Sequence, residues 1–246
     1  GIAPLVAALR DSGPSVRHTA AQWLGKLGRK RTAERLARML SAQGWEVRVR
    51  AAEALHKLGD KRGSAALLTE LKGQDDAGRK AAADCMGELG MRAAIESLVD
   101  MLEDENHDAR NAAALALCKL SDERNSELLQ TLAKNGDPGV RRAATARLGE
   151  FSDKQPVEML IAALKDKDAS VRESAAVALI ESKDKRALKP LIAAMRSASR
   201  DRQWSVAKQA RLALDKLADK DSLETIRAAM KDEDDSVRQW AATTLR

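Results

Sequence analysis

The chain has 246 residues, of which 44% are hydrophobic and 33% charged, and its formal net charge is +6. No apolar run reaches the roughly 20 residues that a membrane-spanning helix needs, and no secretory signal peptide is recognisable. Aromatic residues make up only 2%, and the hydrophobic residues recur with a helical period, which is not typical of a disordered chain.

The strongest pattern is an internal repeat of 31 residues, which an arginine marks in seven of eight copies. These arginines are Arg17, Arg48, Arg79, Arg110, Arg141, Arg172 and Arg238. The seventh copy has Ala207 instead, 35 residues after Arg172, and therefore carries a four-residue insertion. The copies span 1–28, 29–59, 60–90, 91–121, 122–152, 153–183, 184–218 and 219–246. Repetition at this period predicts one stacked array over residues 1–246, with no interior domain boundary.

Each copy contains two predicted helices. The first helix has large apolar residues four positions apart, in the blocks 5–9, 36–40, 67–71, 98–102, 160–164, 191–195 and 226–230; in the fifth copy the second large residue shifts to Leu132. The second helix has one apolar stripe, which in the first copy consists of Val16, Ala20, Leu24 and Leu27. Abundant alanine lets such helices pack closely.

Helix boundaries are marked as well. One place before each second helix holds Gly13, Gly44, Asp75, Asn106, Asp137, Asp168, Gln203 and Asp234, and all except Gln203 are types that begin helices. Proline follows at Pro14 and Pro138, and glycine stands at the expected helix ends at Gly28, Gly59 and Gly90. Hairpin turn signals between alternating apolar runs are absent from the sequence.

The segments "DKDASVRESAAVAL" and "DEDDSVRQWAATTL", each after an L-x-x-x-L helix, resemble the short HEAT-like repeats first described in phycobilin lyases. The resemblance covers all eight copies. It implies an all-α, right-handed superhelix of helix pairs, with second helices lining the concave side, in a protein of bacterial or archaeal type. The same repeat serves scaffolds, adaptors, lyase subunits and a group of DNA glycosylases, so it restricts function only weakly.

We assign the recurrent arginines a structural role in stacking. An aspartate or asparagine stands six residues before most of them, at Asp11, Asp104, Asn135, Asp166 and Asp232, and at Asp201 in the seventh copy. These short side chains are expected to pair with the arginine and with the N–H groups that begin the second helix.

The side of each second helix opposite its apolar stripe is the predicted partner-binding face. Its residues in the fourth to seventh copies are Leu115, Lys119, Arg142, Glu150, Glu173, Val177, Ile180, Glu181, Lys208, Leu212 and Lys216. The same positions in earlier copies include His18, Val49, Glu53, His56, Asp84 and Gly87, with Cys118 in the fourth. Acidic and basic residues alternate there and aromatic residues are missing, which disfavours a nucleic-acid groove.

Four of these residues are apolar, namely Leu115, Val177, Ile180 and Leu212. Either the helices are rotated by some 20° and bury them, or they form a shallow patch bordered by Glu150, Glu173, Glu181 and Lys208. Such a patch suits an amphipathic helix or peptide carrying basic residues. Trp45 and Trp204 occupy one equivalent place at the predicted rim, where each either anchors a partner or seals the loop.

The sequence contains few candidates for a catalytic or metal-binding site. His18, His56 and Glu53 are an unconvincing metal set, and no phosphate loop, HExxH or GxSxG motif occurs. We predict no catalytic residue, metal or cofactor, and a protein or peptide as partner. The alternatives are nucleic-acid binding, through Arg29, Lys30, Arg31 and Arg35, and an accessory subunit of a lyase or other enzyme.

Localisation follows from the cysteines. Cys85 and Cys118 occupy different places in their copies, so we expect free thiols and a cytoplasmic protein that does not associate with membranes. The chain stops within a second helix without a polar capping repeat, so we also expect it to be part of a longer protein.

Overall fold

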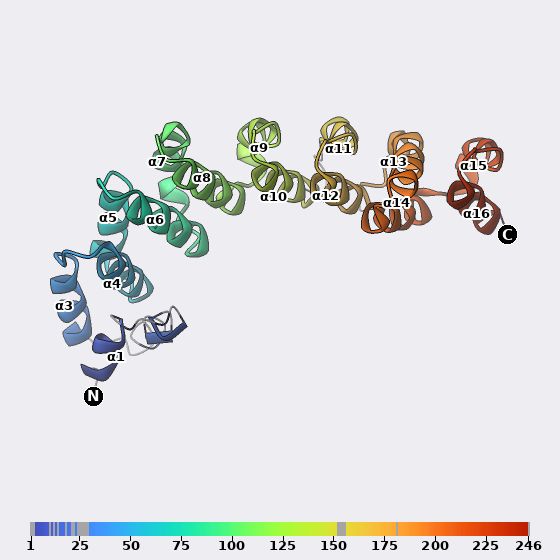
Figure 1. The fold of residues 1–246 in the computed structure, drawn as a ribbon. Coiled ribbons are helices and arrows are strands. Elements are labelled where there is room, and N and C mark those ends of the chain that lie inside the picture. Colours follow the sequence, from blue (N-terminus) through green and yellow to red (C-terminus); the bar gives the residue numbers. More distant parts are fainter. Residues whose placement is uncertain are drawn as a thin grey trace. The chain divides into compact units, whose positions relative to one another are not determined.

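The computed structural model describes the chain apart from residues 1, 2, 10, 12, 14, 18, 21, 22, 24–29, 152–155, 181 and 246. In the described residues all regular structure is helical, as predicted. The chain forms two compact units, Gly1–Leu120 and Ser121–Arg246 (Figure 1). The fold class is therefore all-α, built from helix pairs, while the number of copies, the handedness and the single array remain predictions.

In its described residues, the first unit contains three complete helix pairs. Its helices are α1 (Ala3–Ala8), α3 (Lys30–Met39), α4 (Trp45–Lys57), α5 (Lys61–Glu70), α6 (Asp76–Glu88), α7 (Ile95–Asp100) and α8 (His107–Leu120), with short 3₁₀ segments η1 (Arg92–Ala94) and η2 (Met101–Glu103) on either side of α7. The second helices α4, α6 and α8 pack side by side, and each also packs against a first helix.

The part of the second unit that the structure describes contains four helix pairs. Its helices are α9 (Ser126–Leu132), α10 (Pro138–Gly149), α11 (Val157–Ala163), α12 (Ala169–Ile180), α13 (Leu188–Arg200), α14 (Trp204–Leu217), α15 (Leu223–Ala229) and α16 (Asp235–Thr244), with 3₁₀ segments η3 (Glu123–Asn125), η4 (Lys185–Ala187) and η5 (Lys220–Ser222). In Figure 1 the second helices α10, α12, α14 and α16 form one layer, and the first helices lie on one side of it.

The predicted helix boundaries are confirmed where the structure describes them. Asp75, Asp137 and Asp234 each accept a hydrogen bond from the backbone N–H three residues later, which satisfies a donor that the helix leaves free. Gly59 and Gly90 adopt φ of 78° and 68° after α4 and α6, a conformation that glycine adopts without strain. Pro14, Leu24, Leu27 and Gly28 lie outside the described residues.

Leucine and alanine build the core. In the first unit Leu36 packs with Ala51 and Leu55 in a cluster that excludes water. Small residues allow the helices to approach, since a Cβ on Gly63 of α5 would lie 2.4 Å from the Ala52 carbonyl oxygen of α4. Fully burying one leucine contributes roughly 1.5–3 kcal/mol, so the repeated stripes account for much of the stability.

The insertion in the seventh copy lengthens a helix. α13 has 13 residues, whereas the equivalent helices α11 and α15 have 7 each. Arg202 then adopts φ of 56° before α14 begins. Among the described helices, none is long and apolar enough to cross a membrane.

Candidate functional site

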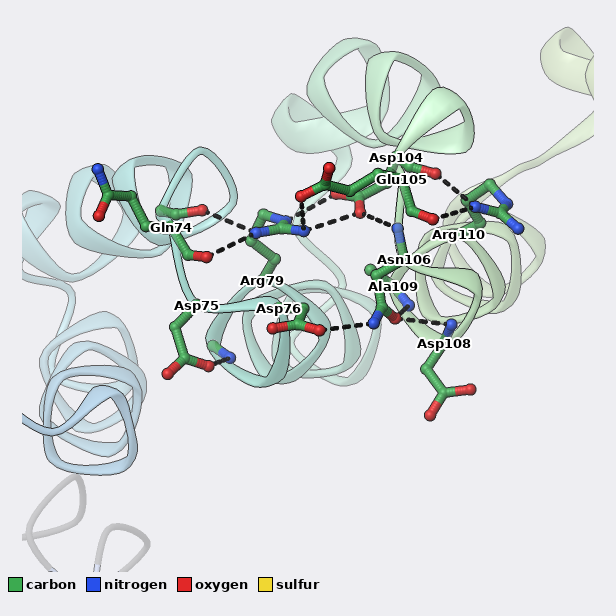
Figure 2. A network of polar contacts seen from close by, with 12 residues as sticks. Gln74, Asp75, Asp76, Arg79, Asp104, Glu105, Asn106, Asp108, Ala109 and Arg110 are labelled. Atoms are coloured by element: carbon green, nitrogen blue, oxygen red, sulfur yellow. Dashed lines mark hydrogen bonds and ion pairs between the residues drawn. The ribbon is translucent and has the colours of Figure 1, made fainter.

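Several of the recurrent arginines tie neighbouring copies together, as Figure 2 shows for Arg79. Its Nε and Nη2 donate to the two carboxylate oxygens of Asp104 at 2.7 and 2.9 Å, and its Nη1 donates to the Gly73 and Gln74 carbonyls. Both charged side chains are only 9% exposed. Hydrogen bonding to Arg79 lowers the pKa of Asp104 and correspondingly raises the pKa of Arg79, so both stay charged.

The arginine takes its carboxylate from the next copy. Arg141 repeats the geometry of Arg79 with Asp166, which lies 25 residues later. The prediction that each arginine pairs with the acidic side chain six residues before it is therefore wrong. That residue offers its backbone carbonyl instead, because the arginine points back at the loop before its own helix.

All seven recurrent arginines make this backbone contact. The carbonyl acceptors belong to Asp11, Ala42, Gly73, Asp104, Asn135, Asp166 and Asp232. The guanidinium groups thus fasten each interhelical loop, whereas the role in stacking that the sequence analysis assigned to all of them stays a prediction. They are not available as a row of ligand-binding cations.

At the junctions that involve Arg48 and Asp232 the usual partner is missing, and a charged residue from elsewhere in the copy replaces it. Gly73 stands where Arg48 would meet an acid, and Glu70 at the end of α5 supplies the carboxylate with oxygen distances of 2.6 and 2.8 Å. Ala207 stands where Asp232 would meet an arginine, and Arg196 of α13 pairs with Asp232 instead. Sequence reasoning missed both replacements, because neither residue lies at the repeat position it replaces.

On the second unit the second helices present one row of exposed residues. Ala146, Val177, Leu212 and Thr243 occupy equivalent places on α10, α12, α14 and α16, and all four are exposed. The two large members, Val177 and Leu212, are 46% and 43% exposed and lie on packed neighbouring helices. We call Val177, Leu212 and the half-buried Ile180 the apolar strip.

Charged residues flank the apolar strip. Arg142, Glu150, Lys208 and Lys216 are exposed, and Glu173 is half-buried. Glu150 also pairs with Arg147 one helical turn away. The α10–α12 side of the strip therefore includes two glutamates and Arg142, whereas α14 contributes two lysines.

On the first unit the predicted face is only partly exposed. Lys119 is exposed and Leu115 half-buried, but Val49, Glu53 and Cys118 are buried, so their assignment to an exposed face is wrong. Gly87 is buried too, because α8 approaches it so closely that a Cβ there would lie 3.0 Å from Ala116. At Gly87, therefore, α6 faces the neighbouring second helix rather than solvent.

Two acidic residues on this unit differ in charge environment. Burial alone would raise the pKa of Glu53, but hydrogen bonds from Lys57 and Arg50 outweigh it and lower that pKa. At Asp84 burial dominates and raises the pKa, although Lys80 and Lys119 oppose the effect. Burial likewise raises the pKa of Cys85 to about 12, so its thiol is not a nucleophile at neutral pH.

The two rim tryptophans differ. Trp45 is half-buried, and a Cβ on Gly78 would lie 3.0 Å from its Cβ, so Gly78 leaves room for the indole. The place equivalent to Gly78 in the eighth copy is filled by the buried Val237, and Trp204 is 68% exposed.

Several predicted positions cannot be placed. His18, Glu181 and Arg29 lie outside the described residues, and the side chains of Lys30 and Arg31 are not described. Nδ1 of His56 lies 2.8 Å from the Ser64 hydroxyl. Among the described residues, no three His, Cys, Asp or Glu side chains form a group that would hold a metal ion.

The stacked helix pairs and their loop-fastening arginines define a helical repeat protein. A family model for HEAT repeats matches residues 2–77, 64–146 and 125–207, so the chain belongs to the HEAT repeat family. No curated protein matches the sequence significantly.

The solved structures that resemble this one include YibA from Escherichia coli, at 20% identity and a TM-score of 0.67 over 99% of this chain and 91% of that one. An engineered protein matches at 20% identity and a TM-score of 0.54, over 99% and 77%. The complex of CpcE and CpcF of phycocyanin lyase from Nostoc sp. PCC7120 matches at 21% and 0.47, over 99% and 94%. At such identities the likeness shows the fold alone.

Proposed function

We propose that the protein is a non-enzymatic scaffold or adaptor that binds another protein or a peptide across the second helices of its C-terminal unit. The observation that carries the proposal is the exposure of Val177 and Leu212 side by side on α12 and α14. Exposed apolar residues that cluster on neighbouring elements mark interaction sites more reliably than single ones do.

Rotation of the helices does not account for this exposure. On α12 the core stripe Val171, Ala175 and Leu179 is fully buried, and on α14 the same holds for Val206, Ala210 and Leu214. Each helix therefore already points its apolar stripe into the core, and the apolar strip is additional to what the fold requires.

The charges around the strip describe the ligand. Glu150 and Glu173 beside α10 and α12 favour basic residues, whereas Lys208 and Lys216 on α14 favour acidic ones. An amphipathic helix fits, with an apolar face over Val177 and Leu212, a basic side chain toward Glu173 and acidic side chains toward Lys208 and Lys216. Because the packed helices change little on binding, most of the entropy loss falls on the ligand.

The test is affinity capture from an extract of the source cells, with the wild type, Val177→Arg, Leu212→Arg and Leu223→Arg as baits. Leu223 on α15 is 41% exposed and lies on a first helix, so it is a matched control for adding one arginine to a surface. We expect one prominent partner that the two strip variants lose, with binding weakened roughly tenfold or more, and that Leu223→Arg retains.

Equal recovery of that partner by all four baits would contradict the proposal. Steeply salt-dependent retention of duplex DNA by the wild type would favour the nucleic-acid alternative instead. Loss of the partner from the strip variants, with the partner itself an enzyme, would place the chain as an accessory subunit. We expect the protein to act in the cytoplasm, since Cys85 and Cys118 are both buried and are not joined in a disulfide.

A further inference from the structure

Arg172 differs from Arg79 and Arg141 because, among the described residues, it does not pair with an aspartate of the next copy. Arg79 and Arg141 each pair with an aspartate 25 residues later in the sequence. With the four-residue insertion added, the equivalent residue for Arg172 is Asp201. Instead Nη2 of Arg172 donates to the side-chain amide oxygen of Gln203, and Nη1 donates to the Asp166 carbonyl. None of its described hydrogen bonds goes to a carboxylate.

The lengthened α13 explains the difference. The helix runs on to Arg200, so Asp201 is its C-cap residue, and the described hydrogen bonds of Arg172 go to Gln203 and the Asp166 carbonyl instead. Asp201 is exposed, and within the described part of the chain its carboxylate pairs with no cation. The half-buried guanidinium of Arg172 therefore has an amide oxygen where Arg79 and Arg141 have an anion.

A cavity of about 390 Å³ lies next to this arginine, between the end of α11 and the middle of α13. Its apolar wall includes Ile161, Leu164, Pro190, Ala193 and Ala194. Its polar wall includes Arg172, Lys165, Lys167, Ser197, Gln203 and Asp201. The volume lies within the range of small-ligand pockets, and the lining combines an apolar surface with a few convergent polar groups.

The charges favour an anion. Lys165 and Lys167 are exposed at the cavity, and the Asp166 carboxylate that also lines it is already held by Arg141. Asp201 is the one acid of the lining without a described cation partner, whereas the lining has three cations, namely Arg172, Lys165 and Lys167. A guanidinium also matches the planar, two-oxygen geometry of a carboxylate.

We propose that this cavity binds a carboxylate group of a peptide, with an aliphatic side chain beside the carboxylate resting against Ala193 and Leu164. The incoming carboxylate takes the place that an aspartate of the chain occupies at Arg79 and Arg141. The site lies among first helices and loops, so it is separate from the apolar strip and does not depend on the proposed function.

The probes are two pairs of short peptides. In one pair acetyl-Leu-Leu-Glu-Leu-amide is compared with its Gln counterpart; in the other acetyl-Leu-Leu with a free carboxyl end is compared with its amide. Binding is followed by NMR through the Arg172 Nε–H and the Ser197 amide. We expect saturable shifts with at least one carboxylate peptide, and roughly tenfold weaker binding of its neutral counterpart. The two pairs distinguish a side-chain from a terminal carboxylate.

Three variants complete the test. Gln203→Glu gives Arg172 a carboxylate from the chain itself, so the protein stays folded, with an unchanged or higher Tm, and loses peptide binding. Ala193→Leu fills the cavity at an exposed position and also loses binding. Ala228→Leu, at the equivalent exposed place on α15, keeps it. Equal shifts with charged and neutral peptides, or full binding by Gln203→Glu and Ala193→Leu, would overturn the proposal.

Discussion

Arg196 on α13 donates from Nε to the Asp232 carboxylate at 3.0 Å, across 36 residues of sequence. The Asp232 side chain is only 6% exposed, and its pKa is lowered chiefly by hydrogen bonding from Arg196. Arg196 thus replaces the arginine that the repeat lacks at Ala207. The cation can come from a different helix as long as it reaches the same buried acid.

This replacement predicts a rescue. Arg196→Ala leaves the Asp232 charge buried with weaker support, so we expect the free energy of unfolding to fall by about 1–3 kcal/mol. Adding Ala207→Arg restores the recurrent arginine, and most of the loss should be recovered. Urea denaturation followed by circular dichroism measures both steps. No recovery in the double variant, or a wild-type midpoint for Arg196→Ala, would contradict the interpretation.

The Arg79–Asp104 pair predicts that an ion pair contributes more to the free energy of unfolding when it is buried. Asp104→Asn removes the anion from a guanidinium that is 9% exposed, and we expect a loss of about 2–4 kcal/mol. Glu233→Gln is the control, because its pair with Arg200 is mostly exposed and contributes at most about 1 kcal/mol. Similar losses for the two variants would show that burial does not control these ion pairs.

The sequence was sufficient to predict the helix pairs. The 31-residue period, the apolar stripes and the capping residues all reflect local backbone chemistry, and the structure confirms the capping at Asp75, Asp137 and Asp234. The arginine partners were less predictable, since the acid belongs to the next copy and Glu70 and Arg196 lie off the repeat register.

The exposure of the proposed binding face was predictable only in part. A helical wheel separates core from surface. It placed Val177 and Leu212 opposite the core stripe but left open whether a small change in helix orientation buries them, and the structure shows both exposed. The helical wheel does not show where the neighbouring second helix lies, and for that reason it misplaced Gly87 and Cys118. The cavity beside Arg172 could not be predicted, because it depends on how four inserted residues extend α13.

Close helix packing gives a further prediction. Gly63→Ala places a Cβ 2.4 Å from the backbone of α4, so α5 must move, and we expect a loss of about 1–3 kcal/mol despite the better helix propensity of alanine. Gly136→Ala is the control, since nothing lies within 4 Å of its added Cβ. Thermal unfolding of both variants is the measurement, and an equal or higher Tm for Gly63→Ala would show that the contact relaxes without cost.

The buried aspartates predict how stability depends on pH. Hydrogen bonds from arginine lower the folded-state pKa of Asp104 and Asp166. In the unfolded chain these aspartates keep their ordinary pKa of about 4, so near that pH the unfolded state binds more protons than the folded state. The stabilisation by the ion pairs is therefore complete above about pH 5 and is lost as the pH falls through the lower folded-state pKa. Urea unfolding from pH 7 to pH 2 should show this decline, and Asp104→Asn with Asp166→Asn should make it shallower.

The effect of Asp84 on the pH dependence of stability has the opposite sign. Burial raises its folded-state pKa, so its ionised form weakens the fold at neutral pH. Asp84→Asn should thus raise stability at pH 7 and steepen the acid decline, and parallel curves for all the variants would refute both assignments.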